Sequence, residues 1–179
     1  MKEYVDYVIV GSGPSGSVIA KRLSERSDVS ICVLEAGRDD KDFFIRVPAG
    51  FVKTLYSGRV TWDYQTEPSD ATHGRKIAMP QGRVVGGSSS VNGLVYSRGQ
   101  REDFDDWEKM GNPGWGYRDV LPYFKRSERR IGDCDPAYRG TTGELPITNS
   151  DWTSPLCDAF ISGCNEFGIP SNPDYNGEN

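Results

Sequence analysis

The chain has 179 residues and carries 21 Lys and Arg against 26 Asp and Glu, which gives a formal net charge of −5 at pH 7. This length is enough to bury the core of one domain. The acidic balance excludes the basic surface that a nucleic-acid-binding protein needs, so a protein that acts on small molecules is the default.

The sequence predicts neither a membrane-spanning segment nor a disulfide framework. No apolar run approaches the ~20 residues of a spanning helix. The first residues lead into a strand and not into the apolar core of a signal peptide, so the cytoplasm is favoured. Cys157 and Cys164 lie two turns apart on a predicted helix, roughly 10 Å along its axis and too far to bridge. We interpret them as small core residues.

The first 35 residues predict a strand, a glycine turn, a helix and a second strand. An apolar run from Val5 to Val10 stops at Gly11, as a buried parallel strand does at a tight turn. A helix is predicted from about Pro14 to Arg26. Alternating apolar residues at 29, 31 and 33 then predict a strand that ends at Glu35.

The turn matches the G-x-G-x-x-G pattern of dinucleotide-binding proteins. The first glycine permits the turn, the second lets a pyrophosphate approach the backbone, and the third lets the helix pack closely on the strand. The phosphate then rests on free amides at the helix N-terminus. The predicted site residues of this turn are Gly11, Ser12, Gly13, Pro14, Ser15 and Gly16.

Glu35 lies 19 residues after Gly16, where an acidic side chain accepts hydrogen bonds from the adenosine ribose. A carboxylate there repels a 2′-phosphate, which argues against an NADP-type cofactor. The alternative is a surface turn with a solvated glutamate, and the strand–helix–strand context argues against it. We include Ala36 in the predicted site. NAD and FAD fit these residues equally well.

Residues 43–82 show poor periodicity and many Gly and Pro residues, so they predict an extended excursion with short helical and strand pieces. Trp62 and Tyr64 fall on one such strand. They pack either on the cofactor or on the domain, and the domain is favoured because aromatic residues serve cores so often. His73, the one histidine, is predicted to be an exposed loop residue.

A second glycine-rich stretch runs from Gly82 to Gly93. Its paired glycines and three serines suit a loop whose amides and hydroxyls face a ligand, before a helix whose N-terminus points at negative charge. A flexible linker is the alternative. Apolar residues on both sides, among them Val84 and Val91, argue against a linker.

Residues 100–167 predict further helices. One ends in a basic group interleaved with Ser127 and Glu128, which we interpret as a solvated helix end in preference to a binding patch; its members are Lys125, Arg126, Arg129 and Arg130. Pro122 bends that helix or marks its start. The predicted elements are helices at Gln100 to Met110, Tyr117 to Arg130 and Ser154 to Phe167, and a short strand at Leu145 to Thr148.

Three motifs resemble one family. The order Gly82-Arg83-x-Val85-Gly86-Gly87-Ser88-Ser89-x-Val91-Asn92, followed by Tyr96, Gly99 and Asp105, is similar to the first signature of the glucose–methanol–choline (GMC) oxidoreductases. The segments Trp62-Asp63-Tyr64-x-x-Glu67-Pro68 and Asn112-Pro113-Gly114-Trp115 also resemble that family, as does the amino-terminal strand–helix–strand unit. The likeness therefore runs along essentially the whole chain.

The resemblance implies an α/β fold, a Rossmann-like FAD-binding domain of GMC type that is incomplete. That domain would cover residues 1–150, and residues 151–179 would begin the segment that leads to the substrate-binding domain. The implied activity is oxidation of a small-molecule alcohol by hydride transfer to FAD. Gly11, Gly13 and Gly16 would serve the pyrophosphate and Glu35 the ribose. The residues implied to line the flavin and its ribityl chain are Val85, Gly86, Gly87, Ser88, Asn92, Gly93, Leu94 and Val95.

The same resemblance implies what this chain lacks. Some members attach FAD covalently through a histidine just before the asparagine of the loop; Val91 stands there, so we expect dissociable FAD. The family's catalytic histidine lies near the carboxyl end of a longer chain, and His73 does not match it. We expect no catalytic residue in this chain, which we interpret as an amino-terminal part that needs a C-terminal remainder. A lyase or decarboxylase on the same fold, or a non-catalytic dinucleotide-binding module, stays open.

Overall fold

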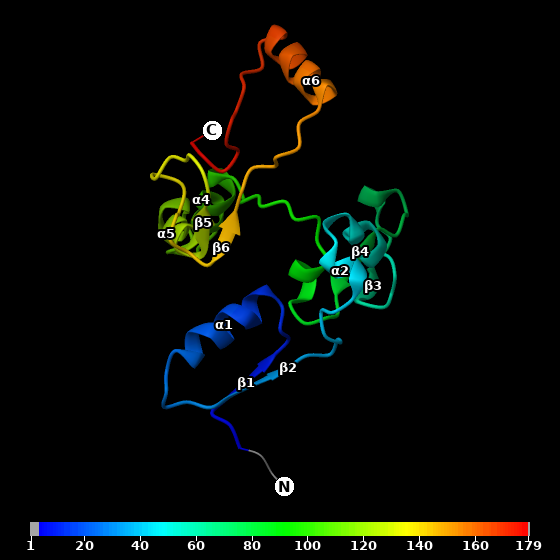
Figure 1. Cartoon of the computed structure of the whole chain (residues 1–179), viewed down its shortest axis with the longest axis vertical. Helices are drawn as coiled ribbons and strands as arrows, with labels where there is room; N and C mark the ends of the chain where they lie inside the picture. The colour runs from blue at the N-terminus through cyan, green and yellow to red at the C-terminus, as the bar shows by residue number, and fades with distance from the viewer. Residues whose placement is uncertain (1–3, 179) are drawn as a thin grey trace. The chain divides into compact units, whose positions relative to one another are not determined.

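The structure, a computed structural model, describes residues 4–178 and divides after Val95 into two compact units (Figure 1). We call residues 4–95 the first unit and residues 96–178 the second unit. The predicted domain boundary at residue 150 stays a prediction, as does the cytoplasmic location. Among the described residues, no helix combines the length and the apolar character that crossing a membrane requires.

The first unit opens with β1 (Tyr7–Val10), α1 (Pro14–Ser24) and β2 (Ile31–Leu34). The two strands pair in parallel, from Tyr7 opposite Ile31 to Val10 opposite Leu34. Helix α1 crosses between them and lies over one face of the pair (Figure 1). The predicted order of strand, glycine turn, helix and strand is confirmed.

The prediction that the first strand is buried is wrong. Ile9 is 9% exposed, whereas its neighbours Val8 and Val10 are 56% and 84% exposed. Successive side chains of a strand point to opposite faces, and Ile9 is the one that faces α1 near Gly16. Within residues 4–178, β2 is the only strand paired with β1, so the opposite face of this two-stranded sheet stays open.

The rest of the first unit consists of short elements, as predicted. Strand β3 (Thr61–Gln65) pairs antiparallel with β4 (Ala78–Gly82). Val60, Val84 and Val91 form a buried cluster against which Ile45 packs, so the loop around residue 87 is anchored at both sides and is not a linker. The remaining elements are α2 (Phe43–Arg46), η1 (Pro48–Gly50), α3 (Phe51–Thr54), η2 (Asp70–Thr72) and η3 (Gly87–Ser90).

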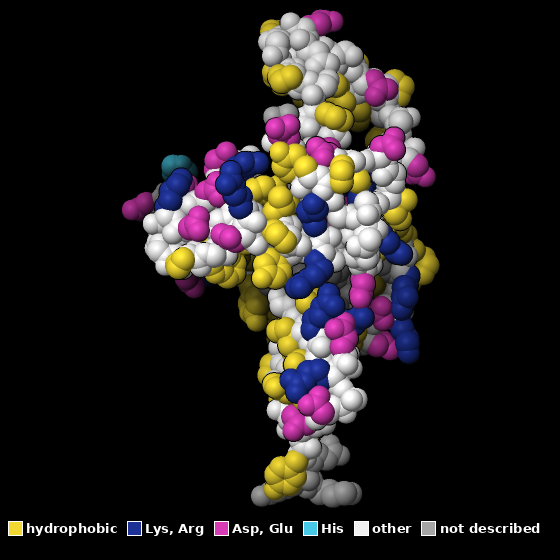
Figure 2. Space-filling view, turned by 90° about the vertical axis from the view of Figure 1, so that its left-hand side faces the viewer, with side chains coloured by type: hydrophobic (Ala, Val, Ile, Leu, Met, Phe, Trp, Pro, Cys, Tyr) yellow, Lys and Arg dark blue, Asp and Glu magenta, His cyan; other side chains and the backbone are white. Residues whose placement is uncertain are grey.

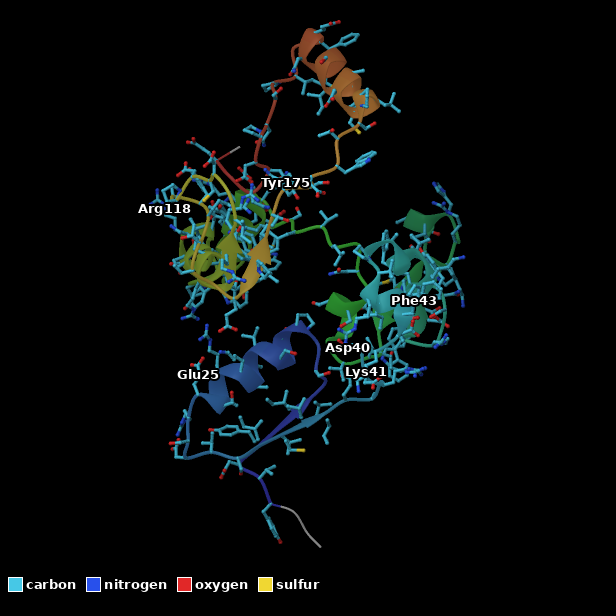
Figure 3. The ribbon with its side chains drawn as sticks, in the orientation of Figure 1. Glu25, Asp40, Lys41, Phe43, Arg118 and Tyr175 are labelled. Atoms are coloured by element: carbon cyan, nitrogen blue, oxygen red, sulfur yellow. The ribbon has the colours of Figure 1, made fainter. Side chains whose placement is uncertain are left out.

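Two side chains show how open these short elements are. Phe43 on α2 is exposed and touches Phe44 edge to face, with ring centroids 5.5 Å apart (Figure 3). His73 is exposed and ends η2 in the left-handed conformation, with φ +50°. The predicted exposure of His73 is confirmed.

The predicted helix after the serine-rich stretch is wrong. The chain makes one 3₁₀ turn, η3, and residues 91–100 contain neither a helix nor a strand. The reason lies in the backbone, because Gly86, Gly87 and Leu94 all have positive φ, at +90°, +59° and +62°. Positive φ lies outside the right-handed helical region, so no α-helix propagates through this stretch.

The second unit contains α4 (Arg101–Lys109), α5 (Tyr117–Ser127), β5 (Glu128–Arg130), β6 (Leu145–Ile147) and α6 (Pro155–Glu166). Strands β5 and β6 pair in parallel. Pro122 lies inside α5. No residue of α6 is buried; Cys157 is exposed and Cys164 is half-buried, so their interpretation as core residues is wrong. Hydrophobic side chains at the surface are visible in Figure 2, and Leu156 and Phe160 of α6 are among the exposed ones.

The interpretation of the basic group as a solvated helix end holds for Lys125 and Arg126 in the last turn of α5 and for the exposed Arg129, but it is wrong for the interleaved Glu128. Helix α5 stops at Ser127, and Glu128 begins β5 with a side chain that is fully buried. Its carboxylate pairs with the guanidinium groups of Arg98 and Arg139. These partners lie 30 and 11 residues away along the chain, so the local sequence of charged residues gave no sign of them.

Candidate dinucleotide-binding site

The glycine turn joins β1 to α1, and two of its glycines meet distinct requirements of the backbone. Gly11 has φ +92°, which allows the chain to reverse at the end of β1. A Cβ atom at Gly16 would lie 2.0 Å from the carbonyl oxygen of Gly11. Only glycine fits at position 16, and its absence of a side chain lets α1 start directly against the turn.

The N-terminus of α1 is open to an anion. Gly13 is its N-cap residue and makes no side-chain capping hydrogen bond; Pro14 follows at the first helical position. The first turn of the helix carries no acidic side chain, and Lys21 and Arg22 stand in the last turn. The amides at the start of a helix have no partner within it, and the helix dipole adds positive potential there. The turn therefore has the donors that a phosphate group requires.

Glu35 follows β2 and is held by three donors. Its Oε2 accepts from the Ser12 amide at 2.8 Å and from the Ser12 hydroxyl at 2.7 Å, and its Oε1 accepts from the Gly37 amide at 2.8 Å. Burial raises the pKa of Glu35, but hydrogen bonds from Ser12 and Gly37 outweigh it and hold the pKa below 4.5. A carboxylate offers about four acceptor positions. Glu35 is thus ionised at neutral pH and keeps an acceptor position on Oε1.

The second glycine-rich stretch is joined to the first. The Val85 amide donates to the Arg38 carbonyl at 2.9 Å, and the Gly86 amide donates to the Ser12 carbonyl at 3.1 Å. At Gly87, with φ +59°, a Cβ atom would lie 2.7 Å from the Cα atom of Gly13. Two backbones that are far apart in sequence therefore touch at paired glycines.

One cavity of about 310 Å³ lies where these segments meet. Its wall contains the glycine turn, the carboxylate of Glu35 and the start of η3, so the two predicted motifs face the same space. This combination of free helical amides, a close glycine backbone and an ionised carboxylate fits a dinucleotide. The cavity is lined by Val10, Gly11, Gly13, Pro14, Leu34, Glu35, Ala36, Trp62, Gly82, Gly87 and Ser88.

The predicted site residues divide into three groups. Gly11, Gly13, Pro14, Glu35, Ala36, Gly87 and Ser88 line the cavity. Ser12 donates to Glu35, Gly16 lies against Gly11, and Gly86 donates to Ser12, while Ser15 and Val85 are exposed.

The structure does not bring Asn92, Gly93, Leu94 or Val95 to the wall of this cavity. All four are exposed, and the Asn92 side chain accepts from the Leu94 amide at 3.0 Å. Their assignment to the flavin stays a prediction.

Four lining residues were not predicted as site residues. Trp62 lies under the Arg83 guanidinium, 4.7 Å from the ring centroid, and stacks on Tyr64. It thus packs on its own unit and lines the cavity at once. Val10 and Leu34 end β1 and β2, and parallel sheets bind ligands beyond the carboxyl ends of their strands, a signal that could have found them. Gly82 is the fourth; a Cβ atom there would lie 2.3 Å from the Gly87 carbonyl carbon.

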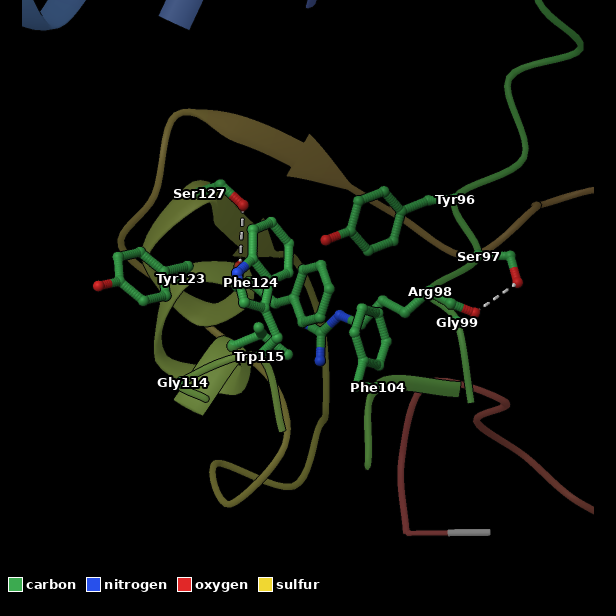
Figure 4. Close-up of a pocket in the computed structure, with 11 residues that line it drawn as sticks. Tyr96, Ser97, Arg98, Gly99, Phe104, Gly114, Trp115, Tyr123, Phe124 and Ser127 are labelled. Atoms are coloured by element: carbon green, nitrogen blue, oxygen red, sulfur yellow. Dashed lines mark hydrogen bonds between the residues drawn. The ribbon is translucent and has the colours of Figure 1, made fainter. Parts of the chain in front are cut away.

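The second unit has its own cavity of about 770 Å³, which is largely apolar (Figure 4). Phe104 and Phe124 stand edge to face in its wall with ring centroids 5.5 Å apart. Trp115, Tyr123 and Arg98 also line it. None of the sequence-predicted site residues lies there, and His73 lines neither cavity.

Comparison with known proteins gives a consistent result. The family model described as GMC oxidoreductase matches residues 5–179. The oxygen-dependent choline dehydrogenase of Rhizobium etli (strain CIAT 652) is 46% identical over 172 residues, which are 96% of this chain and 31% of that protein. The protein of the same name from Vibrio vulnificus (strain YJ016) is 44% identical over 179 residues, 99% of this chain and 32% of its own. The chain spans about a third of the length of these relatives.

Solved structures agree in fold. Pyridoxine 4-oxidase from Mesorbium loti superposes with a TM-score of 0.81 at 37% identity, over 93% of this chain and 33% of its own. Formate oxidase of Aspergillus oryzae RIB40 gives a TM-score of 0.83 at 27% identity, over 97% and 32%. With the family model matched over nearly its whole length, this chain belongs to the GMC oxidoreductase family and has the fold of that family's N-terminal FAD-binding domain.

Proposed function

We propose that this chain supplies the FAD-binding part of a flavoenzyme that oxidises an alcohol. The observation that carries the proposal is that one cavity is lined by the glycine turn, by Glu35, and by Gly87 and Ser88 of the second glycine-rich stretch. The turn and Glu35 alone would suit NAD as well as FAD. Membership of the GMC oxidoreductases favours FAD.

The residues of the cavity fit the adenosine half of FAD. The amides at the start of α1 would hold the pyrophosphate, with Gly13 and Gly87 allowing close approach. Glu35 would accept from the ribose hydroxyls through its remaining acceptor position. Bound FAD supplies the acceptor for the hydride that leaves the alcohol carbon.

We infer that the FAD is not covalently attached. Val91 stands where some relatives have an attaching histidine, and its side chain is 3% exposed within the cluster of Val60 and Val84. A valine side chain has no nucleophile. Acid precipitation of the full-length protein should leave the yellow colour in the supernatant. Colour that stays with the precipitate would contradict non-covalent binding.

We infer a small alcohol as the substrate, with choline first to be tested, because the curated relatives cited above are choline dehydrogenases. Proton abstraction from an alcohol needs a base, and the exposed His73 lines neither cavity. The base is therefore expected outside residues 4–178, in a C-terminal remainder.

An anaerobic titration tests the proposed oxidation. The full-length protein would be mixed with choline, benzyl alcohol and short aliphatic alcohols in turn, with the flavin absorbance recorded without oxygen. Bleaching by at least one alcohol is the expected result, because hydride transfer reduces the flavin. A spectrum unchanged by every alcohol would refute the oxidation and leave only the FAD-binding part of the proposal.

A further inference from the structure

Ser12 occupies a position that the G-x-G-x-x-G pattern leaves free, yet its polar groups are all engaged. Its amide and hydroxyl both donate to Oε2 of Glu35, at 2.8 and 2.7 Å. Its carbonyl accepts from the Gly86 amide at 3.1 Å and from the Ser17 hydroxyl at 2.9 Å. The Gly86 amide also lies 3.4 Å from the Ser12 hydroxyl oxygen. Ser12 is thus bonded to the end of β2 and to the second glycine-rich stretch.

The direction of the hydroxyl bond follows from the charge of Glu35. An ionised carboxylate only accepts, so the Ser12 hydroxyl must donate to it and offers its lone pairs to the Gly86 amide. Two donors from Ser12 on Oε2 and one from Gly37 on Oε1 fix the rotation of the carboxylate. The acceptor position that remains is on Oε1, and Glu35 is one of the residues that line the cavity.

The same residue sets how closely the two motifs approach. Gly86 precedes Gly87, whose backbone packs on Gly13 so tightly that a Cβ atom would lie 2.7 Å away. The bonds from Gly86 to Ser12 hold this contact on one side. The cluster of Val84 and Val91 holds the stretch on the other side.

We propose that Ser12 is a positioning residue of the dinucleotide site. Its hydroxyl orients the Glu35 carboxylate toward the ribose, and its bonds to Gly86 hold the loop of η3 against the glycine turn. The inference rests on the proposed function, because it concerns the same site. Ser12→Ala keeps the three bonds of the backbone amide and carbonyl and loses only the hydroxyl, so it isolates the part played by the side chain.

Binding titrations on the full-length apoprotein test this role. FAD would be followed by its fluorescence, and ADP, which carries the pyrophosphate and the adenosine ribose without the flavin, by competition. Ser12→Ala should weaken FAD and ADP about 10-fold each, as expected for one hydrogen bond to a charged group. Ser12→Thr should restore affinity to within about twofold, because it keeps the hydroxyl. Ser24→Ala is the matched control; it removes a hydroxyl that donates to the Lys21 carbonyl at the far end of α1, and should change neither affinity.

A double-mutant cycle separates positioning from a general loss of structure. In the background of Glu35→Gln, Ser12→Ala should change affinity less than about twofold, because the carboxylate that it orients is gone. If Ser12→Ala did not fold by circular dichroism, Ser12→Cys would replace it, with an intermediate loss expected from its weaker donor.

Three results would each overturn the inference: wild-type affinity in Ser12→Ala, no rescue by Ser12→Thr, or a full loss of about 10-fold when Ser12→Ala is combined with Glu35→Gln. A wild-type protein that bound neither FAD nor ADP would instead overturn the proposed function.

Discussion

Replacing Glu128 with glutamine is predicted to destabilise the second unit severely. The Glu128 side chain is fully buried, and those of Arg98 and Arg139 are 4% and 3% exposed. Arg139 donates from Nε at 2.8 Å, and the Gly140 amide adds a longer contact at 3.5 Å. Arg139 also pairs with Asp174, so its guanidinium ties Glu128 of β5 to the chain near residue 174.

The magnitude follows from the charges left behind. Two guanidinium groups share Glu128, and among the ion pairs of residues 4–178 the one that would remain is Arg139 with Asp174, whose side chain is 30% exposed. Glutamine still offers one oxygen, but its amide group faces guanidinium donors. Removing one partner of a buried ion pair costs about 3 to 5 kcal/mol, and we expect a loss of free energy of unfolding in this range.

Urea unfolding of the full-length protein, followed by far-ultraviolet circular dichroism, measures this loss. The matched control is Asp106→Asn, which breaks an exposed ion pair with Lys109. The side chain of Asp106 is 57% exposed and that of Lys109 is 73% exposed. Surface pairs of this kind contribute little, so the control should change the free energy of unfolding by less than about 0.5 kcal/mol. A Glu128→Gln variant as stable as that control would refute the reasoning, because the buried charges would then not depend on one another.

Two further predictions concern the dinucleotide site. Gly87→Ala should lower the free energy of unfolding by more than about 1 kcal/mol and reduce FAD retention, because φ is +59° and the new Cβ atom would meet Gly13. The control Gly163→Ala lies in helix α6 with open space around it and should raise the free energy of unfolding by about 0.5 to 1 kcal/mol. Equal effects of the two substitutions would contradict this reasoning. The pKa of Glu35 in the folded protein lies below its usual value of 4.5, so the stability that its carboxylate contributes should be complete above pH 4.5 and be lost as the pH falls through the folded pKa. The difference in unfolding free energy between wild type and Glu35→Gln should therefore shrink as the pH falls below 4.5. A difference that stayed constant down to about pH 3 would contradict the lowered pKa of Glu35.

The sequence predicts the fold correctly where neighbouring residues alone determine the backbone geometry. Gly11 has φ +92°, and no Cβ atom fits at position 16. Few residue types other than glycine are possible at these two positions, so the motif identifies the turn. Period-two and helical patterns then locate β1, α1 and β2. The burial of β1 was overestimated because burial depends on what covers the strand, and the described residues cover only the face near Ile9.

Sequence reasoning failed where the deciding contact is distant. Glu128 belongs to a run of charged residues that resembles a solvated helix end. Its burial is possible because its carboxylate forms ion pairs with Arg98 and Arg139, which are distant in sequence. The sequence leaves two roles open for Trp62, packing on its own domain or on the cofactor. In the structure the side chain packs under Arg83 and also lines the cavity. Neither outcome is encoded within a window of neighbouring residues.

The chemistry of the site suggests why binding and catalysis are divided within such an enzyme. Among the described residues that line the cavity, Glu35 is the only titratable one. Its three donors and lowered pKa make it a weak base, because a carboxylate stabilised in its charged form gains little from taking a proton. The features that would suit Glu35 to its proposed role at the ribose therefore make it unsuitable for accepting the proton of an alcohol. Under the proposed function, a second group with a pKa nearer neutrality would take that proton, and the glycine turn, Ser12 and Glu35 would serve only to hold the cofactor.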